Sequence, residues 1–96
     1  MRFFLVTYDI VESKFDKDAN KLSPNEREER LIQKLKGLGP TKQLLNNQWA
    51  LRCSKEPVEI RDYLKEDFGL SDRMVVAETF EGIISHWWTI ESLNGF

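Results

Sequence analysis

The chain has 96 residues, of which 41% are hydrophobic and 31% are charged, and this composition excludes an intrinsically disordered protein. The 14 basic and 16 acidic side chains give a net charge of −2, which excludes nucleic-acid binding through a globally positive surface. Any such binding would need a local basic patch. The sequence contains no long apolar membrane span, and its single cysteine, Cys53, suits a reducing compartment, so we expect a cytoplasmic protein with no membrane partner.

Residues 2–8 form an apolar run that is rich in aromatic and β-branched side chains and is followed by Asp9. Because the run is nearly continuous rather than alternating, it predicts a central strand. Asp9 at its carboxyl end either begins the turn after the strand or acts as a metal ligand. Residues 10–22, which follow, are predicted to form a long loop of mixed charge, and its length invites a functional interpretation.

Two helices are predicted, each from the signal at its N-terminus. The first begins at Ser23 and Pro24, where Glu26 completes a capping box, and it carries leucines at helical spacing until a glycine-rich break. The second begins at Pro57, has an apolar face of its own and is expected to end at Gly69. Both apolar faces should cover the same face of a sheet.

Three more strands are predicted. Residues 41–45 and 48–53 flank a pair of asparagines that suits a tight hairpin turn. The second of these runs alternates and places Cys53 on its inward face, which predicts a buried, unreactive thiol. Residues 73–80 alternate as well and predict the last strand of the sheet.

The C-terminal segment, residues 81–96, is unusually aromatic and β-branched for a tail. A chain of this size has little core left for Trp87, Trp88 and Ile90, so we expect them to pack against a partner surface. Stacking of the two tryptophans on single-stranded bases is the alternative. The sequence is therefore predicted to be one domain, residues 1–96, with residues 81–96 as its tail.

The order of the predicted elements is β-α-β-β-α-β followed by a strand-like tail. This order is typical of an α+β, ferredoxin-like fold with an antiparallel sheet and two helices on one face. Four stretches then carry a resemblance to a known family: VTYD at 6–9, NQWAL at 47–51, EIRDYL at 59–64 and SDRMVVAE at 71–78. They resemble the SinR-like proteins, which are similar to the small CRISPR-associated adaptation endonucleases and to virulence-associated protein D.

This resemblance implies a homodimer in which the aspartate that ends the first strand faces its twin. It also implies that the tail, with Trp87, Trp88 and Ile90 at the dimer interface, packs across the dimer. The pair of aspartates would hold a divalent cation, Mg²⁺ or Mn²⁺, that activates water against a phosphodiester. Only Asp9 matches that role, with Tyr8 as a second candidate catalytic residue that would shape the cleft together with the 10–22 loop. Arg52 and Arg73 are the candidate nucleic-acid contacts.

The expected function is therefore that of a CRISPR-adaptation-nuclease-like homodimer, a metal-dependent phosphodiesterase that acts on nucleic acid. The loop at residues 10–22 departs from the nuclease pattern, because its basic and acidic side chains balance and give no clear electrostatic contact to a phosphate backbone. A non-catalytic dimeric interaction or scaffold protein with the same fold, acting through a protein partner, is the alternative.

Overall fold

A computed structural model of the chain describes residues 2–12 and 22–80. Most of the loop predicted at residues 10–22 lies outside the described residues. The C-terminal segment, residues 81–96, lies outside them too, and with it the predicted interface side chains Trp87, Trp88 and Ile90.

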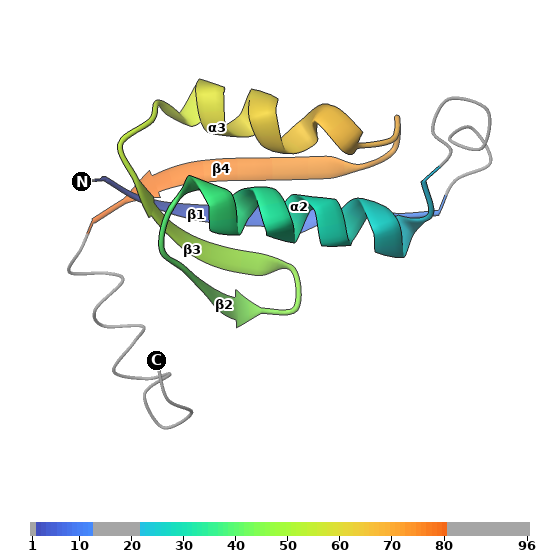
Figure 1. Cartoon of the computed structure of the whole chain (residues 1–96), viewed down its shortest axis with the longest axis horizontal. Coiled ribbons are helices and arrows are strands. Elements are labelled where there is room, and N and C mark those ends of the chain that lie inside the picture. Colours follow the sequence, from blue (N-terminus) through green and yellow to red (C-terminus); the bar gives the residue numbers. More distant parts are fainter. Residues whose placement is uncertain (1, 13–21, 81–96) are drawn as a thin grey trace.

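The four described strands form one antiparallel sheet with the order β2-β3-β1-β4 (Figure 1). β1 (Arg2–Asp9) is central, between β3 (Gln48–Cys53) and β4 (Arg73–Thr79), and β2 (Thr41–Leu45) pairs with β3 in a hairpin. This arrangement confirms the predicted α+β fold of the ferredoxin-like type and the central position of the first strand.

Two helices, α2 (Pro24–Leu38) and α3 (Pro57–Leu64), lie over the same face of this sheet (Figure 1). The predicted capping box of α2 is present. α3 ends before Gly69, because the chain continues as a short 3-10 turn over Lys65–Asp67 and then becomes extended. The core between the helices and the sheet consists of Phe4, Val6, Tyr8, Leu31, Leu35, Trp49, Leu51, Cys53, Ile60 and Leu64.

The sheet has a second face, which none of the described helices covers, and we call it the open face. Side chains alternate along a strand, so the buried Phe4, Val6 and Tyr8 point to the helices and their neighbours point the other way. The strand pairing extends this alternation to the other three strands. The open face consists of Phe3, Leu5, Thr7, Asp9, Lys42, Leu45, Gln48, Ala50, Arg52, Arg73, Val75, Ala77 and Thr79.

Gly39, directly after α2, allows the chain to pass close to β3. The amide of Arg52 donates a hydrogen bond of 3.0 Å to the carbonyl oxygen of Pro40. A Cβ atom on Gly39 would collide with the Arg52 carbonyl oxygen. We therefore expect Gly39→Ala to lower the free energy of unfolding by about 2 kcal/mol, measured by urea denaturation, because the backbone must shift to relieve the overlap.

Gly37→Ala is the matched control for this substitution. A Cβ atom on Gly37 would meet no atom within 4 Å, and the residue lies inside α2. Alanine is the better helix former, so the free energy of unfolding should rise by about 0.5–1 kcal/mol. Equal effects of the two substitutions would contradict the steric role of Gly39.

Candidate functional site

Asp9 ends β1 on the open face, and its side chain is exposed. Its partner in β4 is Arg73, which is also exposed. Residues directly opposite each other in an antiparallel pair have neighbouring side chains on the same face. A carboxylate and a guanidinium therefore lie side by side at one end of the open face.

Exposed apolar side chains lie next to this pair. The neighbouring row across the open face contains Thr7, Gln48, Leu45 and Val75. Gln48 Nε2 donates a hydrogen bond of 3.1 Å to Thr7 Oγ1, as expected for side chains on one face. Leu45 and Val75, on either side of this polar pair, are 60% and 62% exposed. Exposed apolar side chains in the row beside a charged pair are a candidate contact surface.

Tyr8 precedes Asp9 but points to the helix-covered face, where it is 3% exposed. Its hydroxyl donates a hydrogen bond of 2.9 Å to Glu28 Oε2 and lies 3.3 Å from the carbonyl oxygen of Asn46. Burial raises the pKa of Tyr8 to about 12; the Trp49 indole opposes this rise and the Glu28 carboxylate adds to it. The phenol is thus protonated at neutral pH and can act in the site as a hydrogen-bonding group.

Tyr8 and Asp9 both line a cleft of about 190 Å³ at the end of β1. The start of α2 and the turn between β2 and β3 form its other walls, and Glu28 adds a second carboxylate. Sequence reasoning missed Glu28. The available signal was its spacing, because it precedes the buried Leu31 by three residues and so lies beside the apolar stripe of α2.

One chain does not supply a complete metal site in its described part. No group of three or more His, Cys, Asp or Glu side chains that could hold a metal ion occurs in residues 2–12 and 22–80. Mg²⁺ requires a nearly octahedral set of oxygen ligands. The exposed carboxylate of Asp9 fits such a site only as one ligand among several, some of which must come from a second copy, a substrate or water.

Arg52 and Arg73, the two predicted nucleic-acid contacts, both lie on the open face but at opposite ends. Arg52 is opposite Phe3 and Arg73 is opposite Asp9. Phe3 and Asp9 are six residues apart along β1, which corresponds to a distance of about 20 Å. The two arginines therefore cannot bind the same phosphate, and each end of the face has a positive charge of its own.

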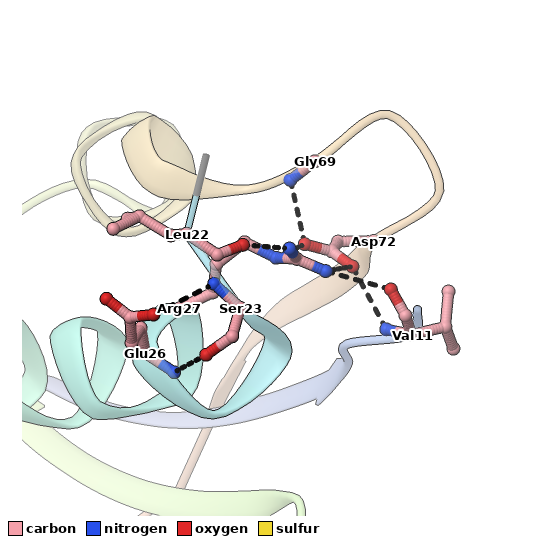
Figure 2. Close-up of polar contacts among 7 residues, drawn as sticks. All are labelled: Val11, Leu22, Ser23, Glu26, Arg27, Gly69 and Asp72. Carbon is pink, nitrogen blue, oxygen red and sulfur yellow. Dashed lines mark hydrogen bonds and ion pairs between the residues drawn. The ribbon is translucent and has the colours of Figure 1, made fainter. Parts of the chain in front are cut away.

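A buried ion pair, Arg27 with Asp72, is the polar cluster that sequence reasoning missed (Figure 2). Arg27 is 2% exposed, and its Nε atom donates to Asp72 Oδ2 at 2.9 Å. Its Nη1 and Nη2 atoms each donate at 2.8 Å, to the carbonyl oxygens of Leu22 and Val11. One guanidinium thus connects the start of α2, the end of β1 and the turn before β4.

The Asp72 carboxylate also accepts hydrogen bonds from two backbone amides. It accepts hydrogen bonds of 3.0 Å from the Val11 amide and 2.8 Å from the Gly69 amide (Figure 2). A signal for Arg27 existed in the sequence, since it precedes the buried Leu31 by four residues and so places a charge on the apolar stripe of α2. Because both side chains are buried and their hydrogen bonds join three segments of the chain, we assign this pair a structural role.

The raised pKa of Tyr8 leads to a prediction for alkaline pH. The unfolded chain loses the phenolic proton near the ordinary value of 10, whereas the folded chain keeps it to about 12. The contribution of the protonated Tyr8 phenol to the free energy of unfolding is therefore complete below pH 10. It is lost as the pH rises through this window, by about 1.4 kcal/mol per pH unit. Urea denaturation between pH 9 and pH 12 should show a smaller fall in the free energy of unfolding for Tyr8→Phe than for the wild type. Equal falls in the two proteins would contradict the raised pKa of Tyr8.

Comparison with known proteins gives no relative, because no family model, no curated protein and no solved structure matches the chain. Among the described residues, no helix has the length and apolar character needed to cross a membrane. The residues of the open face and the cleft are therefore the basis for a function.

Proposed function

We propose that the chain is a homodimeric, metal-dependent phosphodiesterase that acts on nucleic acid, as its resemblance to the CRISPR-associated adaptation nucleases implies. The observation that carries the proposal is the position of Asp9, exposed at the end of the central strand and outside the helix-covered core. A twofold axis near this position would bring two Asp9 carboxylates together. Two chains would then supply a ligand set that one chain lacks.

The exposed apolar side chains beside Asp9 support self-association at this end of the open face. Leu45 and Val75 are 60% and 62% exposed, and a second copy would remove them from water. An interface of this kind uses the same patch on both chains, so residues close to the axis meet their own copies. Residues 81–96, with Trp87 and Trp88, are proposed to enlarge the interface.

In this dimer each group of the cleft has a separate task. The divalent cation would supply Lewis acidity and lower the pKa of a bound water. The two Asp9 carboxylates would bind it, since hard cations prefer carboxylate oxygens. Arg73, opposite Asp9 in the sheet, would contact a phosphate oxygen. Tyr8 would hold Glu28 in place through its 2.9 Å hydrogen bond and so shape the cleft.

The test is cleavage of labelled single-stranded RNA and DNA with Mg²⁺, with Mn²⁺ and with EDTA. We expect cleavage with metal only, and its loss in Asp9→Ala. Asp62→Ala is the control, because Asp62 is an exposed carboxylate on α3 that pairs with the exposed side chains of Arg61 and Lys65. Cleavage by Asp9→Ala at the wild-type rate would disprove the proposal.

A non-catalytic dimeric interaction module is the second candidate. It is favoured by the exposed Leu45 and Val75, which offer an apolar contact surface whether or not Asp9 binds a metal. The same experiment separates the two functions. A chain with the mass of a dimer by light scattering that cleaves neither RNA nor DNA with either metal would be an interaction module.

A further inference from the structure

The end of the open face opposite to Asp9 contains a pocket of about 210 Å³. Its lining includes the aromatic ring of Phe3, the small side chain of Ala50 and the cationic side chains of Lys42 and Arg52. Among residues 2–12 and 22–80, no carboxylate lines it, although the chain as a whole has a net charge of −2. The pocket therefore combines an apolar, aromatic surface with a local positive charge.

Strand pairing fixes how these side chains lie relative to one another. Phe3 of β1 is directly opposite Arg52 of β3, and Ala50 of β3 is directly opposite Lys42 of β2. Side chains in such pairs have Cβ atoms about 5 Å apart. Arg52 is exposed, so its guanidinium can reach a ligand that lies on the Phe3 ring.

A ligand with a flat aromatic ring and a nearby negative charge matches this arrangement. Bases of single-stranded nucleic acids stack on aromatic side chains and on guanidinium planes, and their phosphates bind the neighbouring cations. The small Ala50 leaves room for a ring above the sheet. At about 210 Å³ the pocket is smaller than sites for drug-sized ligands, which begin near 300 Å³, so it suits a single base.

We propose that this pocket binds one base of a single-stranded nucleic acid, stacked on Phe3, with Arg52 on the adjoining phosphate. The choice of a polynucleotide depends on the proposed function, which this inference deepens by naming the substrate class. The pocket and Asp9 lie on the same face about 20 Å apart, so a strand held at the pocket can extend to Asp9. A duplex is excluded, because its bases are already stacked and paired.

The test is fluorescence anisotropy with short labelled oligonucleotides of single-stranded RNA, single-stranded DNA and duplex DNA, all in EDTA. Phe3→Leu should weaken single-strand binding about tenfold. Arg52→Gln should weaken it several-fold and reduce the slope of log affinity against log salt by about one, between about 50 and 200 mM. Arg61→Gln removes an exposed arginine from α3 and should leave the affinity unchanged.

Each outcome decides the proposal. Weaker binding of single strands by both pocket variants supports the proposal. Tighter binding to RNA than to DNA, or the reverse, then identifies which nucleic acid the pocket prefers. Equal affinity of the wild type and both pocket variants, equal affinity for the duplex, or no binding at all would overturn it. Arg52 is exposed, so Arg52→Gln remains decisive even where Phe3→Leu fails to fold by circular dichroism.

The experiment separates this inference from the proposed function. Binding is measured in EDTA, so it does not depend on a metal at Asp9, which lies at the other end of the face. Normal binding without cleavage by the wild type would disprove the catalytic proposal alone. Metal-dependent cleavage with wild-type affinity in Phe3→Leu and Arg52→Gln would disprove the pocket alone.

Discussion

Arg27→Met is expected to lower the free energy of unfolding by about 3–5 kcal/mol, measured by urea denaturation. Methionine keeps an apolar side chain of similar length but removes the guanidinium. The Asp72 carboxylate, whose side chain is 0% exposed, would then be a buried charge without its partner. The carbonyl oxygens of Val11 and Leu22 would each lose a hydrogen bond of 2.8 Å. The largest cost comes from the Asp72 carboxylate, because water cannot replace the lost partner of a fully buried charge.

Arg30→Met is the matched control, since Arg30 lies three residues further along α2. Its side chain is 56% exposed, and it contacts Asp67 at 3.5 Å. An exposed ion pair contributes less than about 1 kcal/mol, so this variant should be close to the wild type. A loss of less than 1 kcal/mol in Arg27→Met would contradict the structural role of the pair.

Arg27→Lys distinguishes charge from geometry. A lysine keeps the positive charge but has one ammonium group, whereas the guanidinium reaches Asp72, Leu22 and Val11 in three directions. We expect Arg27→Lys to lose most of the stability that Arg27→Met loses. Stability equal to that of the wild type would mean that charge alone is sufficient.

The elements that sequence reasoning predicted correctly are those specified by neighbouring residues. The capping box of α2 needs only Ser23 and Glu26, which are three positions apart. The hairpin between β2 and β3 needs only the Asn46-Asn47 turn and the runs beside it. Cys53 is buried as predicted, because the alternation along β3 assigns its face.

The features that sequence reasoning missed depend on residues far apart in the chain. Arg27 and Asp72 are separated by 45 positions, and nothing local identifies their pairing. The contact of Tyr8 with Glu28 likewise needs α2 to lie against β1. Arg52 is a further case, because its place beside the Phe3 pocket and far from Asp9 follows only from the register of β1 with β3. Spacing along one element suggests which face a residue is on, but the partner on that face comes from the tertiary fold.

The largest effect on activity is expected for Asp9, and mixed dimers would show how many copies the site needs. Asp9→Ala alone should reduce metal-dependent cleavage on the order of 100-fold or more, because the cation loses its protein ligands. Wild-type and Asp9→Ala chains are then mixed in equal amounts at constant total concentration and allowed to exchange. Random pairing makes about one quarter of the dimers wild type on both sides.

If both Asp9 carboxylates are required, the mixture should cleave at about one quarter of the wild-type rate, because only dimers with two Asp9 residues are active. A rate of about one half would mean that each chain works alone, with Glu28 as the nearest second carboxylate in its cleft. About three quarters would mean that one Asp9 per dimer is sufficient. Either of these two results would contradict the need for both Asp9 carboxylates while keeping Asp9 as a catalytic residue.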